Sequence, residues 1–557
     1  MSVTRRQSHS RPLLDCTAPM IPLTLFGIAF AVRAIVGMAF ADPAYPDSFY
    51  YVNVARQLAE GNGFQVDYIW NFVDVGGVLP ADPQLPIPAN AHWMPLATVV
   101  QVPFISLLGP TAVASALPFW MAGAAAAPLA FLIGVDVGAG RGAALAAGLV
   151  TAAPGAVTPF LSQPDNFSLF MPLGALALWL CARGIGGDRR AFILGGLIAG
   201  LATLARNDGV LLGVPFALAA AVDLLRRPRL SRIGLGAAIA CAGLFVLVVG
   251  PWLLRQIEVF GTISPSAASG RILWIADYRQ LYSVSSETTF TSFLAQGAGP
   301  LLQSRIEGLA AAISIFVLWP LVAVLAPFAA VGAWRRRRDA RFAPFFVYAA
   351  ALFALSGLLF AVHVPHGTFI HSAVALLPHT YVLVFIGLAG VVGWIARRRR
   401  KWDVRQATMV FTAGAVGIAL LAAGLRTALT VGVWQDELQL RTEVVRGLDD
   451  APPGDLLMSP DAGAYRYLTG HGGIVTPDDP LEVIEGAARA YGVRWLILER
   501  NHTVGALAPV LLGQASPPWL SAPVLEVRAA EAAAAGVSPA AALYAVCFSP
   551  ADERCDP

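Results

Sequence analysis

Lysine is almost absent from this chain, and charge of either sign is scarce. Only Lys401 among the 38 basic residues is a lysine, and charged residues make up 13% of the 557-residue sequence. Ordinary soluble domains carry roughly 25% charged residues. Because 57% of the residues are hydrophobic, a soluble core would not hide so much apolar surface, and the composition indicates a membrane protein. The net charge of +3 is too small to indicate nucleic acid as a partner.

Cysteine is also rare, with five residues in the chain. Cys16, Cys181 and Cys241 fall in or beside predicted membrane segments, on the reduced side. Cys547 and Cys555 lie together near the C-terminus, where a disulfide is permitted but no spacing fixes one. Cysteine therefore neither defines a scaffold nor marks a metal site.

Long apolar runs are abundant. A helix needs about 20 apolar residues to cross the hydrocarbon core of a bilayer. The sequence predicts a polytopic α-helical membrane protein with about eleven transmembrane helices, at residues 21–40, 113–135, 143–160, 166–180, 192–204, 210–225, 233–254, 309–333, 342–362, 372–395 and 407–425. The first run is long enough to span and lacks a clear cleavage site, so it is interpreted as a retained helix.

Arginine clusters fall in alternate loops. With eleven spans, the clusters near residues 5–11, 141, 183–190, 226–232, 335–341 and 397–405 all lie on one side. The excess of positive charge in cytoplasmic loops makes that side cytoplasmic. We therefore expect an integral plasma (inner) membrane protein with a cytoplasmic N-terminus and an extracytoplasmic C-terminal domain.

Two domains are predicted. Residues 1–433 form the transmembrane domain, with a first outer loop at about 41–110 that carries amphipathic interfacial helices and a second at about 255–305. Residues 434–557 form a small α/β domain. It has strands predicted at 456–459, 473–476 and 493–498, helices at 462–468 and 480–490, and a further strand at 543–547.

Acids are missing from the middle of the predicted spans. Coupled transporters usually place an acid near the midplane of the bilayer. Here the acids gather at the outer ends, at Asp42, Asp47, Asp165, Asp208 and Glu307. This distribution favours chemistry at the outer interface over passage through the membrane.

Asp47 is the candidate general base, although an acid after Pro46 at a helix start is also typical of an N-cap. Asp165 and Asp208 could likewise serve only as caps or turn residues. Arg206, Arg255 and Arg33 are candidate phosphate ligands, because a guanidinium offers a planar fork of donors. Anchoring of a helix end explains Arg255 equally well, and reaching toward the interface explains Arg33 equally well.

Four histidines crowd one outer segment, at His363, His366, His371 and His379. Their spacing matches no standard zinc motif, so metal binding, substrate contact and a structural role remain as alternatives. Of the four, His366 and His371 are the predicted substrate contacts.

Several short motifs, in their order along the chain, resemble the GT-C superfamily of polyprenyl-phosphate-sugar-dependent glycosyltransferases. The similarity is to its ArnT-like and protein mannosyltransferase-like, family 39-type, branches. The motifs are Asp47 with Tyr50 and Tyr51, Gly61-Asn62-Gly63-Phe64, His92-Trp93-Met94-Pro95-Leu96, Gln163-Pro164-Asp165, the 201–206 segment ending in Arg206, Pro251-Trp252 with Arg255, and Gly367-Thr368-Phe369.

The resemblance implies an inverting glycosyltransferase of the GT-C fold. It would move a sugar from a polyprenyl-phosphate donor to an acceptor hydroxyl on a glycan, a lipid or a protein. Asp47 would be the base, the arginines would hold the donor phosphate, and the substrate-binding residues would be Tyr50, Tyr51, His92, Asp165, His366 and His371.

The first outer loop departs from the family pattern at one position. The family often has two adjacent acids there, and this chain has Ser48 at the second, which weakens the case for a divalent metal. No cofactor is therefore predicted. The competing interpretations are a lipid or polymer transporter or flippase, and a non-catalytic scaffold whose outer domain binds a partner.

Overall fold

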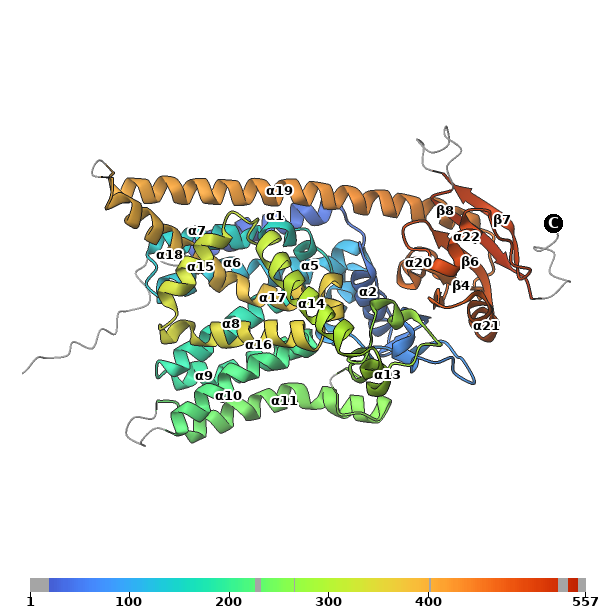
Figure 1. Ribbon diagram of the computed structural model, residues 1–557, viewed down its shortest axis with the longest axis horizontal. Coiled ribbons are helices and arrows are strands. Elements are labelled where there is room, and N and C mark those ends of the chain that lie inside the picture. Colours follow the sequence, from blue (N-terminus) through green and yellow to red (C-terminus); the bar gives the residue numbers. More distant parts are fainter. Residues whose placement is uncertain (1–19, 226–231, 265, 400–401, 529–538, 549–557) are drawn as a thin grey trace, which may run out of the picture.

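The computed structural model describes residues 20–225, 232–264, 266–399, 402–528 and 539–548. A bundle of helices forms the larger part, and a small α/β unit lies beyond one end of it (Figure 1). The 42-residue helix α19 (Val404–Val445) runs along the bundle and continues to that unit. At 1.5 Å per residue this helix is roughly 63 Å long. Residue 434, where the sequence places the domain boundary, lies inside it.

The transmembrane domain contains further helices, most of which follow the predicted apolar runs. They are α1 (Met20–Ala39), α2 (Pro46–Ala59), α3 (Leu96–Val99), α4 (Val102–Leu108), α5 (Ala112–Ala124), α6 (Ala126–Asp136), α7 (Arg141–Ala152), α8 (Phe167–Ile185), α9 (Arg189–Ala205), α10 (Gly213–Leu224), α11 (Leu235–Phe260), α12 (Ser269–Ile272), α13 (Phe290–Ala295), α14 (Ala298–Leu318), α15 (Ala326–Arg336), α16 (Ala343–Leu358), α17 (Thr368–Ala373) and α18 (Leu377–Ala396).

Within the described residues, nine helical segments are long and apolar enough to cross a membrane, and ten if the bent pair Arg141–Ala152 and Gly155–Ser162 forms one span. The remaining predicted span, at 192–204, corresponds to α9, which has 17 residues. The protein is thus an integral multi-pass membrane protein, as predicted, with a slightly smaller number of full-length spans than eleven.

One predicted span is broken. The run at 309–333 forms two helices, α14 and α15, because Pro320 follows the end of α14 and cannot continue the hydrogen-bond ladder. The exposed carbonyls of the break are satisfied by neighbours: Trp319 accepts from the Ala156 N–H at 3.0 Å, and Pro320 accepts from the Tyr381 hydroxyl at 2.8 Å. Hydrophobicity alone does not reveal such a break.

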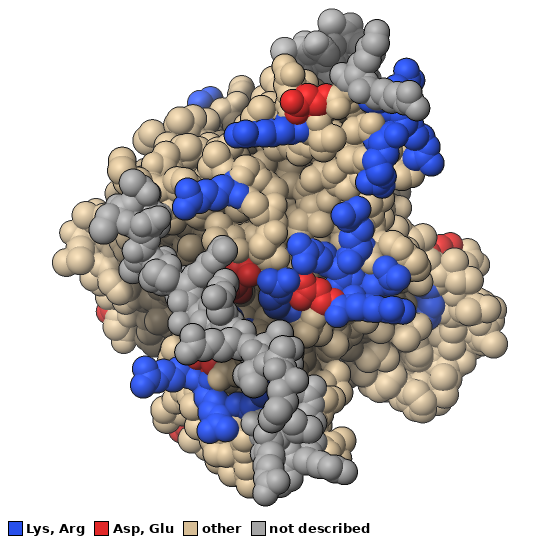
Figure 2. All heavy atoms as spheres, turned by 90° about the vertical axis from the view of Figure 1, so that its left-hand side faces the viewer, with Lys and Arg blue, Asp and Glu red and all other residues tan. Residues whose placement is uncertain are grey.

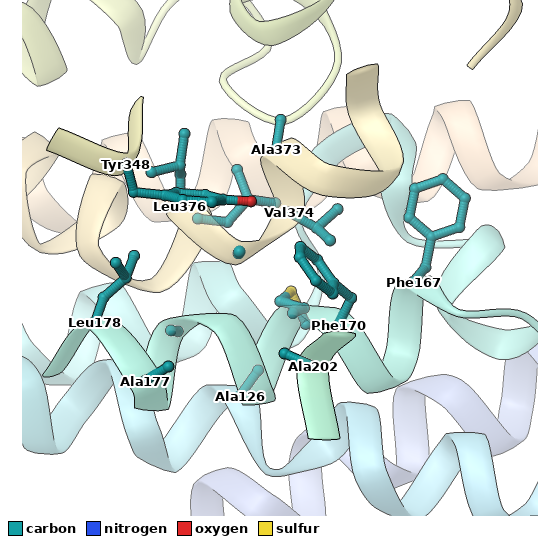
Figure 3. Packing of buried hydrophobic residues seen from close by; sticks show 14 of the residues in the cluster. Ala126, Phe167, Phe170, Ala177, Leu178, Ala202, Tyr348, Ala373, Val374 and Leu376 are labelled. Atoms are coloured by element: carbon teal, nitrogen blue, oxygen red, sulfur yellow. The ribbon is translucent and has the colours of Figure 1, made fainter. Parts of the chain in front are cut away.

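Helix α8 lies at the centre of the main hydrophobic core. Its Phe170 and Leu178 pack with Val374 and Leu376, which follow α17 in the chain (Figure 3). The approach is close at Gly174, where a Cβ atom would lie 2.4 Å from the Cβ of Ala375. This packing fixes the N-terminal end of α8 against α17, and both ends border the candidate site.

The α/β unit contains a six-stranded sheet with the order β2-β5-β4-β6-β8-β7. Its strands and helices are β2 (Tyr68–Ile69), β4 (Leu456–Ser459), α20 (Ala462–Thr469), β5 (Gly473–Val475), α21 (Leu481–Tyr491), β6 (Val493–Glu499), α22 (Ala508–Leu511), β7 (Leu520–Val527) and β8 (Ala541–Val546). Strands β2, β5, β4 and β6 are parallel to one another. Strand β8 is antiparallel to both of its neighbours, β6 and β7, so β7 runs in the same direction as β6.

The predicted strand and helix alternation of this unit is confirmed, and two strands were not predicted. Strand β7 closes one edge of the sheet. Strand β2 closes the other, and it comes from the first outer loop, about 400 residues earlier in the chain. Two further short strands, β1 (Gln65–Val66) and β3 (Ile87–Pro88), pair within that loop. The α/β unit is therefore joined to the loop that carries Asp47.

Arginines gather at the end of the bundle that faces away from the α/β unit (Figure 2). This end contains the turn between α8 and α9, with Arg183 and Arg189, and the C-terminal ends of α15 and α18. Cys16, Cys555 and the basic residues near 5–11 and 226–231 lie outside the described residues.

Candidate active site

Asp47 lies in the first turn of α2, after an extended Tyr45 and after Pro46. The start of α2 has no side-chain cap hydrogen bond, so the structure does not give Asp47 the N-cap role. Residues 48–55 of α2 are all buried. The side chain of Asn53, expected on the polar face, donates to the Gly463 carbonyl of α20 at 2.9 Å. Helix α2 is thus held between the bundle and the α/β unit, with Asp47 at its base.

Three side chains from distant segments converge at this point. The two ring nitrogens of His371, on α17, lie 3.8 Å from Asp47 and 3.8 Å from Asp165, which precedes α8. The Tyr45 hydroxyl donates to the second carboxylate at 2.9 Å. The His371 ring packs edge-on against Phe167, with centroids 3.8 Å apart. Asp165 is fully buried, whereas Asp47 keeps a quarter of its side chain exposed.

Burial raises the pKa values of both acids. Burial, followed by the charge of Asp47, raises the pKa of Asp165 to about 8. Burial raises the pKa of Asp47 to about 6, although the charge of Arg206 lowers it. Both acids are therefore easier to protonate than an ordinary carboxyl group, and they titrate as a coupled pair. A carboxylate whose pKa is raised toward neutrality is suited to accept a proton.

Asp47 opens into a cavity of about 360 Å³ between the first outer loop, the 3₁₀ helix η8 (Ala361–His366) and the neighbouring helix ends. Of the predicted site residues, six line it: Asp47, Tyr51, His92, Arg206, His366 and His371. Four do not, namely Tyr50, Asp165, Arg255 and Arg33. Tyr50 lies directly behind the wall, where its ring packs against Trp93 at 4.0 Å and its hydroxyl accepts from the Asn90 N–H.

The cavity has an aromatic wall and neutral imidazoles. Trp70 and Trp93 are stacked with centroids 4.0 Å apart, and Tyr278 is stacked on His366 at 3.8 Å. Burial lowers the pKa of His92 to about 3, and its Nδ1 atom has no hydrogen-bond partner among the described residues. Flat apolar faces with a few polar atoms are typical of a small-molecule site.

Arg206 supplies positive charge to this cavity. It follows α9 and forms a fork with Asp208, with N–O distances of 2.9 and 3.3 Å. The guanidinium also donates to the Ser372 hydroxyl and the Thr368 carbonyl, which ties α9 to α17. Burial opposes its charge, but the pair with Asp208 raises the pKa of Arg206 above its ordinary value. Arg206 is thus a fixed cation at the cavity wall.

Arg255 and Arg33 lie elsewhere. Arg255, on α11, donates to the Ala89 carbonyl at 2.9 Å and is surrounded by the rings of Phe64, Trp252 and Phe260. It therefore braces the first outer loop. Arg33, on α1, is fully buried and donates to the Ala152 carbonyl at the C-terminal end of α7. The Arg33 side chain therefore caps the end of α7 inside the bundle and does not extend to the cavity.

One group among the described residues has the geometry to hold a metal ion. It consists of Asp47, Asp165 and His371, whose potential ligand atoms lie within 4.8 Å of one another. The donor set of two carboxylates and one imidazole suits a divalent cation. However, Asp165 already accepts from Tyr45 and from the Asn166 N–H, and its pKa favours the protonated form. The fit to a metal is partial.

Several lining residues were not predicted as site residues, among them Trp70, Trp93, Asn166 and Tyr278. The motif containing His92 includes Trp93, so a signal for it existed. Trp70 and Tyr278 are ordinary aromatic residues of loops in the sequence. Nothing in their local pattern indicates that the fold brings them together.

Neither a protein-family model nor a curated protein matches this sequence. Solved structures do. ArnT from Cupriavidus metallidurans in the apo state has a TM-score of 0.53 at 13% identity, covering 95% of this chain and 98% of that one. The same protein bound to undecaprenyl phosphate has a TM-score of 0.51 at 14% identity, covering 97% and 100%. An Archaeoglobus fulgidus oligosaccharyltransferase tethered to an acceptor peptide has a TM-score of 0.46 at 14% identity, covering 87% and 70%.

The likeness to ArnT extends over nearly the whole chain. At this level of identity it concerns the fold, and the predicted GT-C fold with its small C-terminal α/β unit is confirmed.

Proposed function

We propose that the protein is an inverting glycosyltransferase that moves a sugar from a polyprenyl-phosphate donor to an acceptor hydroxyl. The observation that carries this proposal is the position of Asp47. It belongs to a buried pair of acids, and it faces a cavity that also presents the cation Arg206. The fold supports the donor class, because ArnT has been solved with undecaprenyl phosphate.

The reaction is a single displacement. The acceptor oxygen attacks the anomeric carbon while Asp47 takes the hydroxyl proton. The bond between that carbon and the phosphate oxygen breaks, and its electron pair leaves with the polyprenyl phosphate. Attack from the side opposite the leaving group inverts the anomeric configuration. Arg206 stabilises the negative charge that develops on the phosphate, and Tyr45 and His371 keep Asp47 and Asp165 in place.

The donor and the bilayer set the orientation. The arginine-rich end of the bundle is cytoplasmic by the positive-inside rule, so the cavity and the α/β unit lie on the extracytoplasmic side. Nucleotide sugars are absent there, and a lipid-anchored sugar reaches the cavity sideways from the membrane. The N-terminus is then cytoplasmic, and the boundary between the transmembrane and outer domains falls within α19 near residue 434.

The test is turnover with defined donors. The purified full-length chain in lipid nanodiscs is incubated with radiolabelled polyprenyl-phosphate pentoses and hexoses, and in parallel with nucleotide sugars. We expect release of polyprenyl phosphate from at least one lipid donor, with an inverted linkage in the product by NMR. Turnover of nucleotide sugars alone, or retention of configuration, would contradict the proposal.

A further inference from the structure

A second cavity, of about 540 Å³, lies between the α/β unit and the bundle. One wall comes from the α/β unit and the opposite wall from α19 and from Tyr45 and Pro46, at the start of α2. It is distinct from the catalytic cavity, since the two sets of lining residues do not overlap.

The α/β wall is the carboxyl edge of the parallel strands. Asp461 follows β4, Thr476 follows β5, and Asn501 and His502 follow β6, and all four line the cavity. The chain passes from β4 to β5 on one side and then crosses to β6 on the other side of β4. Such a reversal opens a crevice at the carboxyl ends of the strands, where open α/β sheets bind ligands.

Carboxylates outnumber guanidiniums among the charged groups of this cavity. The Arg441 guanidinium lies 3.0 Å from Asp461 and 3.0 Å from Glu499. Arg279 lies 3.6 Å from Asp478. Glu437 adds a further carboxylate beside His502. Because the lining has three carboxylates, those of Glu437, Asp461 and Asp478, against two arginines, the cavity offers poor complementarity to a phosphate-rich or otherwise anionic ligand.

The remaining groups are suited to a carbohydrate. Tyr45, Tyr282 and Trp434 contribute aromatic surface, against which the C–H face of a sugar ring packs. Asn501 and Thr503 offer amide and hydroxyl groups that exchange hydrogen bonds with sugar hydroxyls. Carboxylates accept hydrogen bonds from neutral hydroxyl groups as well as from cations.

An unsatisfied group points to a ligand independently of the strand topology. Thr476 lines the cavity and is 4% exposed, and its hydroxyl has no hydrogen-bond partner within the described part of the chain. A buried hydroxyl without a partner costs free energy, so its retention is explained if a bound molecule supplies the partner.

The second cavity adjoins the first. Tyr45 and Pro46 line the second, and the next residue, Asp47, lines the first. The Tyr45 hydroxyl is bonded to Asp165, so the turn between the cavities is held rigidly. A molecule seated at the strand edge would have a neighbouring residue within reach of the general base.

We propose that this second cavity binds the acceptor, and that the acceptor is an uncharged glycan. This inference rests on the proposed glycosyl transfer. The strand edge holds the part of the glycan that does not react, and the attacking hydroxyl extends past Tyr45 to Asp47.

Binding is tested without catalysis. The labelled full-length chain in nanodiscs is applied to an array of neutral, sulfated and phosphorylated oligosaccharides. The variants are Thr476→Val, which removes the hydroxyl but keeps the shape, and Asn501→Ala. The matched control is Gln514→Ala, an exposed amide of the same unit outside the cavity lining.

We expect the wild type to bind neutral glycans. Thr476→Val and Asn501→Ala should each weaken binding about fivefold, as expected for one lost hydrogen bond of about 1 kcal/mol, and Gln514→Ala should not. Preference for charged glycans, no binding to neutral ones, or equal binding by all variants would overturn the inference. Asp47→Asn should bind like the wild type, so a failure of the catalytic proposal is seen separately, in the transfer assay.

A kinetic readout complements the array. In the transfer assay with a glycan that binds, Thr476→Val should raise the KM for the acceptor about fivefold and leave both kcat and the KM for the donor unchanged. A fall in kcat alone would place the effect at the reacting atoms and would contradict the assignment of an acceptor site.

Discussion

The chain buries two groups of acids, and it neutralises them to different extents. In the α/β unit, Arg441 lies 3.0 Å from both Asp461 and Glu499. In the first cavity, Asp47 and Asp165 lie 3.8 Å from His371, Asp165 also accepts from the Tyr45 hydroxyl, and Arg206 is bonded to a different acid. The arrangement around Arg441 gives each acid a directly bonded cation. The arrangement around His371 leaves both acids without one, and burial raises their pKa values, as is typical of functional sites.

Removing the carboxylate of Asp47 gives the largest expected effect on activity. Asp47→Asn should lower kcat by about 10²- to 10⁴-fold, the usual contribution of general base catalysis. The unfolding temperature should stay unchanged, because Asp47 makes no cap hydrogen bond and its burial opposes the charged form. Transfer kinetics and thermal unfolding measure both. Asp82→Asn, an exposed acid of the same loop, is the control. Near wild-type turnover would remove Asp47 from the mechanism.

Removing the cation that is paired with Asp461 and Glu499 should instead lower stability. Arg441→Ala leaves Asp461 and Glu499 buried without their cation and should destabilise the protein by about 3–5 kcal/mol. The measurement is unfolding of the full-length chain followed by tryptophan fluorescence. The triple variant Arg441→Met, Asp461→Asn, Glu499→Gln removes all three charges and should recover much of the stability. If Arg441→Ala lowers activity but not stability, the contrast between the two groups is wrong.

The pH profile separates the two acids of the catalytic pair. The rate should rise with pH through about 6 as Asp47 loses its proton, with a tenfold loss per pH unit below that value. Asp165→Asn should leave this limb in place, because a pKa of about 8 keeps Asp165 protonated over the same range. A rate that is flat between pH 5 and 7 would show that Asp47 does not titrate in the working enzyme.

Exchange of the cation at the cavity wall should have a smaller effect. Lysine keeps the charge of Arg206 but loses the planar fork that joins Asp208, Ser372 and Thr368. We expect Arg206→Lys to raise the KM for the donor about tenfold, or about 1.4 kcal/mol. Arg183→Lys, at the opposite end of the bundle, is the control. Equal donor kinetics in both variants would remove Arg206 from donor binding.

The smallest expected effect is that of metal removal. Asp47, Asp165 and His371 form the group with metal-like spacing among the described residues, but Asp165 favours its protonated form and is hydrogen-bonded to Tyr45. We therefore expect transfer to continue at an unchanged rate after treatment with EDTA. Loss of transfer, restored by Mg²⁺ or Mn²⁺, would show that the acid pair is a metal site. Asp47 and Asp165 would then be neutralised by a cation, as Asp461 and Glu499 are.

Patterns that are local in the sequence were predicted well. The apolar runs gave the helices, the alternation of short strands and helices gave most of the α/β unit, and Pro46-Asp47 gave the start of α2. These features follow from hydrophobic length, periodicity and backbone stereochemistry, each visible within about 20 residues.

Features that depend on distant contacts were not predicted. The break after α14 is stable only because Ala156 and Tyr381 satisfy its carbonyls. Arg33 has the same charge as Arg206, yet its position on α1 directs it to the end of α7. The meeting of Asp47, Asp165 and His371 requires three segments to pack against each other, and no local pattern specifies that packing.

The pairing of β2 with β5 has a consequence for biosynthesis. Tyr68 and Ile69 pair with Gly473 and Ile474, so this strand of the first outer loop cannot form until a segment about 400 residues downstream has been synthesised. At roughly 5–20 residues per second of translation, this delay is tens of seconds. The segment bearing Asp47 can therefore pair with the α/β unit only after nearly the whole polypeptide has been synthesised. A nascent or truncated chain would therefore lie in the membrane without an assembled catalytic centre.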